Sequence, residues 1–145
     1  MRSVLLALLV GGGIMTLAAV LFFVGAEPLV RFFLGANRPA TADLAVDLMR
    51  VVAFSTPALA AAMILTGALR GAGDTRWPLM VTLIGFLGIR IPLAYYLAWN
   101  PIELPLLGVI VGVVGAWYAM LVETLLRAVL IGLRFWHGGW KRVQV

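Results

Sequence analysis

Four long apolar runs, separated by short polar segments, set the pattern of the chain. They cover about residues 4–24, 44–69, 79–99 and 107–135. A helix needs about 20 mostly apolar residues to cross a hydrocarbon core about 30 Å thick, and each run is long enough. The pattern therefore predicts an all-α, polytopic membrane protein with four transmembrane helices. We expect a single membrane domain over residues 1–145, in which residues 136–145 form a basic, aromatic tail.

The segments between the runs predict the connections. Residues 27–34 mix charged and aromatic side chains, which favours a short helix lying at the membrane interface. Residues 100–105 (Asn-Pro-Ile-Glu-Leu-Pro) predict a loop that its two prolines stiffen. Pro57 and Pro92 stand inside apolar runs, where the missing N–H of proline frees a backbone carbonyl. We expect each proline to kink its helix.

The composition agrees with a protein that lives in a bilayer. Hydrophobic residues make up 63% of the chain and charged residues only 12%, and the mean hydropathy of +1.08 exceeds that of soluble domains. The chain has no Cys, and its one His is His137 in the tail, which excludes disulfides, thiol chemistry and His-based metal sites. Because it offers no nucleophile–base pair and no phosphate-binding loop, we expect no enzyme, no catalytic residues, no metal and no cofactor.

The basic residues predict the orientation of the chain. The net charge is +5, but the cations are spread along the span ends rather than gathered in a patch with interleaved aromatics, which argues against nucleic-acid binding. One side of the predicted membrane holds Arg2, Arg70, Arg76, Arg134, Lys141 and Arg142, and the opposite loops hold only Arg31 and Arg38. By the positive-inside rule we expect both termini to be cytoplasmic, in a multi-pass protein of the inner (plasma) membrane.

Three charged residues lie within the third and fourth predicted spans at a distance from the span ends. Arg90 is about 18 Å from the cytoplasmic end of its span, at 1.5 Å per residue, and a charge at that depth is costly. Glu123 reaches nearly the same depth in the antiparallel fourth span. We therefore predict an intramembrane ion pair between Arg90 and Glu123, with Arg127 one helical turn away competing for the carboxylate. Such a pair either fastens two helices or forms part of a transport path.

A compact, charged, Gly-rich segment at residues 67–78 connects the second and third spans. Its candidate hinge residues are Arg70, Gly71, Gly73, Asp74, Thr75, Arg76 and Pro78. Asp74 or Thr75 can cap the start of the third helix and Pro78 suits its first turn, while the two glycines allow backbone angles that other residues resist. The segment is either a cytoplasmic elbow that couples two helices or a well-capped loop that only sets orientation.

Several motifs follow one another along the chain. They are Leu69-Arg70-Gly71-Ala72-Gly73-Asp74-Thr75-Arg76 with Pro78, then Arg90-Ile91-Pro92-Leu93-Ala94-Tyr95, Gly108 and Gly112, Arg134-Phe135, and Trp140-Lys141. In this order they resemble the multidrug and toxic compound extrusion (MATE) transporters. The resemblance implies the last four helices of the C-terminal lobe of a twelve-helix transporter with two six-helix lobes. It also implies cation-coupled export of cationic or amphipathic compounds by alternating access, with the bilayer and the remaining helices of the full-length transporter as partners.

The resemblance also bears on where the coupling ion and the substrate bind. Some sodium-coupled relatives carry an acidic residue midway along the helix that matches the second span, where this chain has Ser55, Thr56 and Pro57. A site for the coupling ion, sodium or proton, is therefore expected outside this chain. Trp117 and Tyr118 are candidates for lining a cavity where an aromatic face meets a cationic drug, although a place in the core is the simpler role.

Three alternatives to a multidrug antiporter stay open at this point. The first is a related flippase that moves lipid-linked oligosaccharides. The second is a small four-helix transporter that builds its own pathway by self-assembly, which the number of spans allows. The third is an inactive truncated membrane fragment.

Overall fold

The computed structural model of the protein describes residues 2–34, 39–104, 108–110 and 112–138. Its elements are α1 (Arg2–Val24), α2 (Ala26–Leu34), α3 (Pro39–Gly71), α4 (Arg76–Ile84), the π-helix η1 (Gly85–Arg90), α5 (Ile91–Trp99), β1 (Ile102–Leu104), β2 (Gly108–Ile110) and α6 (Gly112–His137). Within these residues, four helical stretches are long and apolar enough to span a membrane: α1, α3, the continuous α4–η1–α5 unit, and α6. The prediction of an all-α polytopic membrane protein is confirmed.

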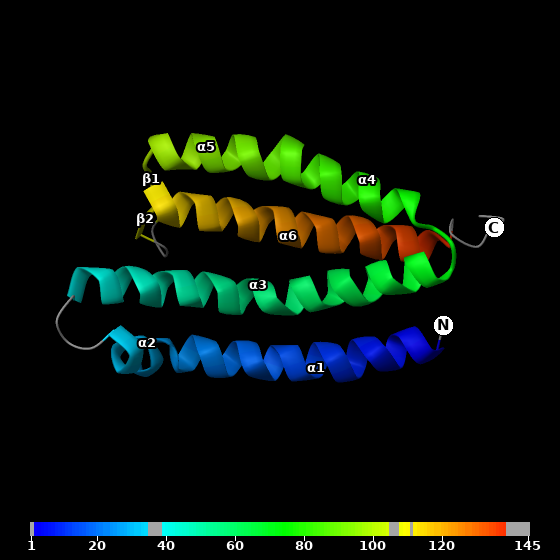
Figure 1. Cartoon of the computed structure of the whole chain (residues 1–145), viewed down its shortest axis with the longest axis horizontal. Coiled ribbons are helices and arrows are strands. Elements are labelled where there is room, and N and C mark those ends of the chain that lie inside the picture. The colour runs from blue at the N-terminus through cyan, green and yellow to red at the C-terminus, as the bar shows by residue number, and fades with distance from the viewer. Residues whose placement is uncertain (1, 35–38, 105–107, 111, 139–145) are drawn as a thin grey trace.

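The four long helices lie side by side in one row (Figure 1). α1 packs against α3, α3 against α6, and α6 against η1 and α5. The helices α3 and α6 run in the same direction, because the α4–η1–α5 unit returns the chain between them. As a result, the start of α1, the end of α6 and the elbow between α3 and α4 (residues 72–75) share one end of the row, called the elbow end below.

Basic residues gather at the elbow end. Arg2 begins α1, Arg70 and Arg76 flank the elbow, and Arg134 stands in the last turn of α6. Arg31 belongs to α2, at the opposite end of the row (Figure 1). The structure thus brings together in space the four cations that the sequence analysis assigns to one side of the membrane, and the assignment of that side to the cytoplasm stays a prediction.

Two small apolar clusters join the helices, one toward each end of the row. At the elbow end, the buried residues are Leu65 and Leu69 of α3, Val81 of α4 and Ile131 of α6. At the other end they are Ala26 and Val30 of α2 with Ala42 and Val46 of α3. The short helix α2 therefore folds against the start of α3 through its apolar side. Its Phe32 and Phe33 remain exposed.

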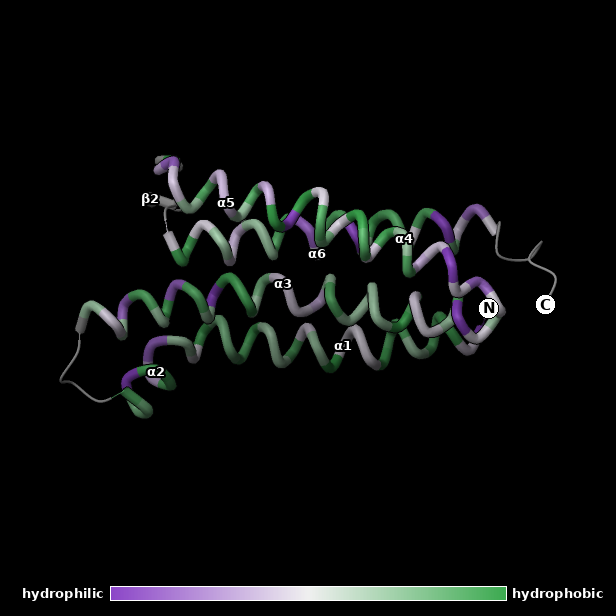
Figure 2. Tube along the Cα trace, turned by 45° about the horizontal axis from the view of Figure 1, so that its top comes forward, coloured by the Kyte–Doolittle hydropathy of each residue, from purple (hydrophilic) through white to green (hydrophobic). Residues whose placement is uncertain are grey.

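Most of the apolar helix surface is not covered by the chain itself. In the most apolar stretch of each span, the buried share is 6% for α1, 33% for α3, 17% for α4–η1–α5 and 28% for α6. Figure 2 shows that α1 is apolar along most of its length. A helix that is hydrophobic all round belongs in a membrane or in a larger core. The four helices therefore present surfaces that lipid or further helices must cover.

The two intramembrane prolines are accommodated differently. α3 continues through Pro57, and the hydroxyls of Ser55 and Thr56 each donate to the carbonyl of Val52 at 2.8 Å. Pro92 follows the π-helix η1, in which the N–H of Ile91 donates to the carbonyl of Phe86, five residues back. The α-helical bonding pattern is thus already replaced by a wider turn just before Pro92, a residue that has no N–H to donate. Kinking at either proline stays a prediction.

The fourth span begins later than the apolar pattern indicates. The run starts near residue 107, but α6 begins at Gly112 and residues 108–110 form β2. This strand pairs antiparallel with β1, with Ile102 opposite Ile110, so two short strands join the expected proline-stiffened loop to the start of the apolar run. Gly112 has a φ of +60°, a left-handed conformation that a continuing right-handed helix does not adopt. This backbone angle separates the helix from the strand.

A close backbone approach at a glycine joins α5 and α6. A Cβ atom added to Gly115 would lie 2.7 Å from the carbonyl oxygen of Leu97 and 2.9 Å from its Cβ atom. Gly67 and Gly112 each stand four residues from another glycine in the sequence, a spacing that lets helices approach closely, but an added Cβ at either would meet nothing within 4 Å. The helix contact therefore depends on Gly115, because only a residue without a side chain allows this separation.

We expect Gly115→Ala to destabilise the protein and Gly67→Ala to leave it unchanged or slightly more stable. The first variant forces α5 and α6 apart and should cost about 1–3 kcal/mol. The second adds a better helix former in open space. The midpoint of thermal unfolding in detergent measures both, and equal midpoints for the two variants would show that the Gly115 contact does not matter.

Candidate functional site

The elbow begins with a tightly closed end of α3. Gly73 has a φ of +88°, in the left-handed region. Its N–H donates to the carbonyl of Arg70 at 3.0 Å, and the N–H of Asp74 donates to the carbonyl of Leu69 at 3.0 Å. These two bonds form the Schellman arrangement, which satisfies the last carbonyls of a helix and favours glycine at this position. The chain leaves α3 in a fixed direction as a result.

Asp74 is the centre of the elbow. Its Oδ2 atom accepts a hydrogen bond from Nε of Arg134 on α6 at 3.0 Å, and Nη2 of the same guanidinium lies 3.0 Å from that oxygen in an ion pair. Its Oδ1 atom accepts from the backbone N–H of Trp77 at 3.4 Å, which caps the start of α4. The guanidinium of Arg134 also lies 5.0 Å from the centre of the Trp77 ring. Asp74 is 4% exposed, so this carboxylate joins α4 to α6 from a buried position.

The predicted hinge residues divide into two groups. Asp74, Gly73 and the buried Pro78 in the first turn of α4 form the closed elbow. Arg70, Gly71, Thr75 and Arg76 are exposed, and Thr75 makes no side-chain cap bond. Sequence reasoning named Arg134 for orientation and as part of a motif, but it missed the pairing of Arg134 with Asp74. Its position 60 residues from Asp74 gives no local signal, and only the packing of α6 beside the elbow brings the two together.

The Asp74–Arg134 ion pair sets the register of α4 and η1 against α6. Gly85 lies eleven residues after Asp74, and Glu123 lies eleven residues before Arg134. These two positions meet: a Cβ added to Gly85 would lie 3.1 Å from Oε1 of Glu123. The absence of a side chain at the first residue of η1 therefore makes room for the carboxylate of Glu123, which is 1% exposed.

Glu123 pairs with Arg127 rather than with Arg90. Nη2 of Arg127 donates to Oε2 of Glu123 at 3.4 Å, and Nε lies 3.3 Å from Oε1 without hydrogen-bond geometry. Among the ion pairs of the described residues none joins Arg90 to Glu123, so the predicted partner is wrong and its competitor takes the carboxylate. The physical reason is the register, because Gly85 stands opposite Glu123 and Arg90 is five residues farther along.

Arg90 instead lies beside an aromatic ring in a groove between η1, α5 and α6. Its guanidinium carbon is 5.3 Å from the centre of the Phe86 ring. The groove has a volume of about 380 Å³ and is lined by Phe86, Arg90, Ile91, Ala94, Ala116, Trp117 and Met120. Of the two predicted cavity residues, Trp117 therefore lines a groove. Tyr118 is half-buried and does not line this groove.

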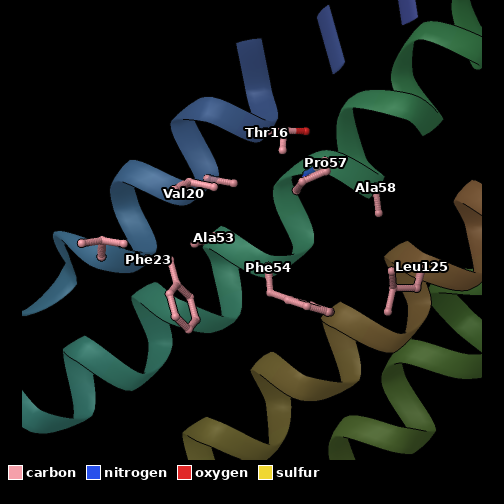
Figure 3. Close-up of a pocket in the computed structure, with 10 residues that line it drawn as sticks. Thr16, Val20, Phe23, Ala53, Phe54, Pro57, Ala58 and Leu125 are labelled. Carbon is pink, nitrogen blue, oxygen red and sulfur yellow. The ribbon is translucent and has the colours of Figure 1, made fainter. Parts of the chain in front are cut away.

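A second groove lies between α1, α3 and α6. Its volume is about 460 Å³, and its lining includes Val20 and Phe23 of α1, Phe54 and Pro57 of α3, and Leu125 of α6 (Figure 3). Thr16 is the one hydroxyl-bearing residue in the lining, and its Oγ1 already donates to the carbonyl of Gly12. The lining can hold an apolar group, but it offers no charge to orient one. In the part of the chain that the structure describes, no group of three acidic or His side chains could hold a metal ion.

The chain is similar to known proteins over most of its length. A family model described as MatE matches residues 1–96. The chain belongs to the MatE family.

Relatives of this MatE chain carry multidrug resistance names. A probable multidrug resistance protein NorM of Thermotoga maritima is 28% identical over 126 residues, which cover 87% of this chain and 25% of the relative. A probable NorM of Bradyrhizobium diazoefficiens is 32% identical over 136 residues, covering 92% and 28%. The NorM of Burkholderia vietnamiensis is 30% identical over 132 residues, covering 89% and 27%. The chain thus spans about a quarter of the length of these relatives, and no solved structure gave a significant match.

We expect Arg134→Met to destabilise this MatE chain more than Arg31→Met. The first substitution leaves the buried Asp74 carboxylate without its cation and should cost about 2 kcal/mol or more. The second removes an ion pair whose side chains are 68% and 53% exposed, which is worth little. Unfolding in detergent measures both losses. If Asp74→Asn fails to recover any stability in the Arg134→Met background, the two residues are not coupled.

We expect Arg127→Met to lower the free energy of unfolding by about 2 kcal/mol, because Glu123 is left buried and unpaired. Arg90→Met removes a costly charge and one contact with an aromatic ring, so its effect should stay below about 1 kcal/mol. The same unfolding measurement compares the two variants. The reverse order of effects would restore Arg90 as the partner of Glu123.

Proposed function

We propose that this MatE chain forms part of one lobe of a multidrug efflux antiporter. The observation that carries the proposal is the match to multidrug resistance proteins over about nine-tenths of this chain and a quarter of theirs. Such an antiporter exports cationic or amphipathic compounds in exchange for sodium ions or protons. Alternating access then exposes one central site first to one side of the membrane and then to the other.

The uncovered helix surfaces support a place within a larger assembly. Between two-thirds and nearly all of each span's most apolar stretch is not buried within the chain. In a six-helix lobe, further helices cover part of this surface and lipid covers the rest. Both termini then lie in the cytoplasm and the protein spans the inner membrane, since four cations gather at the elbow end.

The elbow suits the transmission of movement within such a lobe. Asp74 binds Arg134 on α6 and the first turn of α4 at once, and Gly73 fixes the direction in which α3 ends. The cytoplasmic ends of these helices therefore move as one body when the lobe changes its tilt. The binding of the coupling ion takes place on helices outside this chain, in line with the resemblance.

The proposal is tested by drug accumulation in cells that lack their main efflux pumps. We expect the full-length protein containing this chain to lower the accumulation of ethidium, and the 145-residue chain alone to behave like an empty vector. The reason is that an export path needs the surfaces that the chain leaves uncovered. Membrane insertion of each protein is followed by an epitope tag as a control.

Other outcomes separate the alternatives. Lower accumulation with the 145-residue chain alone would mean that it assembles its own pathway as a small oligomeric transporter. No change with either protein, at equal membrane levels, would contradict export of cationic compounds altogether.

A further inference from the structure

Arg90 lies deep in a span without an anionic partner in the described part of the chain. The ion pairs found there are Glu27–Arg31, Glu123–Arg127 and Asp74–Arg134. Asp43 and Asp47 belong to α3, which α6 separates from η1 in the row of helices (Figure 1). Arg90 is nine residues before the end of α5, which corresponds to about 13 Å at 1.5 Å per residue. An arginine at this depth carries a cost that an anion would offset.

Arg90 lies in a groove formed by η1, α5 and α6. The groove volume of about 380 Å³ falls in the range of pockets for small organic molecules. Phe86 lies against one side of the guanidinium, and Trp117 and Met120 of α6 supply an apolar and aromatic surface on the other element. Arg90 provides the one formal charge of the lining. A single cation among apolar walls is complementary to an amphiphile with one acidic group.

We propose that Arg90, Phe86 and Trp117 form a binding site for the carboxylate of a small amphipathic compound. The guanidinium pairs with the carboxylate, which it can meet with two parallel N–H bonds. The apolar body of the compound lies against Trp117 and Met120. Binding at this site does not depend on the proposed export function. The role of the site in transport rests on that function, whose substrates then include compounds that carry a carboxylate.

The register of the helices keeps this site open. Glu123 is held at the level of Gly85 and engaged by Arg127, so it does not neutralise Arg90. The residues of α6 that face Arg90 across the groove are Ala116, Trp117 and Met120, none of which carries an acidic group. The same geometry that contradicts the expected Arg90–Glu123 pair therefore leaves a cation available to a ligand.

The first test measures binding directly on the full-length protein in vesicles of neutral lipid. The probes are dansylglycine, which has one carboxylate, and its methyl ester, which has the same body without the charge. Energy transfer from Trp to the dansyl group reports binding. We expect the acid to bind roughly tenfold or more tightly than the ester, as loss of a charge-assisted hydrogen bond implies.

Variants assign that difference to Arg90. Arg90→Met should reduce the affinity for dansylglycine to that of the ester, and Arg90→Lys should recover part of it. Arg31→Met, at an exposed arginine paired with Glu27, is the matched control and should change nothing. Equal affinities of acid and ester for the unaltered protein, or no effect of Arg90→Met, would overturn the proposal.

Two further measurements identify the source of the anion that binds Arg90 and test the proposed export function separately. Adding phosphatidylglycerol to the vesicles should leave dansylglycine binding in place, and complete displacement would make a lipid headgroup the occupant and overturn the proposal. Ethidium export by the same protein tests the proposed function independently. Export that persists in Arg90→Met, together with lost acid binding, supports both proposals, whereas acid binding without any export contradicts the proposed function alone.

Discussion

The ion pair between Asp74 and Arg134 is the interaction on which the arrangement of the other helices depends. Among the ion pairs of the described residues it is the one that does not lie within a single helix, and it ties the elbow to the end of α6. Once it is fixed, the antiparallel α4–η1–α5 unit has one register against α6. That register places the small residue Gly85 beside Glu123 and, farther along, Gly115 beside Leu97.

The same register gives two intramembrane arginines different chemistry. Arg127 stands one helical turn after Glu123 and shares its buried carboxylate, so the pair is close to neutral. Arg90 stands past the level of Glu123 and contacts the face of Phe86. An aromatic face offsets only part of the cost of a cation in a membrane. The residual charge is confined to the groove between η1, α5 and α6.

Features decided by neighbouring residues could be predicted from the sequence. The four spans follow from run length, the elbow from its glycines, Asp74 and Pro78, and the short helix α2 from its mixed polarity. The family follows from the order of these motifs. In each case the physical cause lies within a few residues along the chain, as with the cap that Asp74 gives to Trp77.

Features decided by packing between distant segments could not be predicted. Counting residues from estimated span ends put Arg90 and Glu123 at one depth, but the position at which two helices meet was set by Asp74 and Arg134. Gly115 was not distinguished from the other glycines, since its role depends on the backbone of Leu97. The strand β2 was hidden in an apolar run, because β-branched residues suit a strand as well as a span.

The π-helix η1 changes how the third span should be drawn on a helical wheel. A π turn contains more residues than an α turn, so the side chains that follow Arg90 are rotated out of phase with those of α4. The two halves of one continuous span thus have independent angular settings. The elbow orients the first half and the contact at Gly115 orients the second, and a wheel with a single period would place one of them on the wrong face.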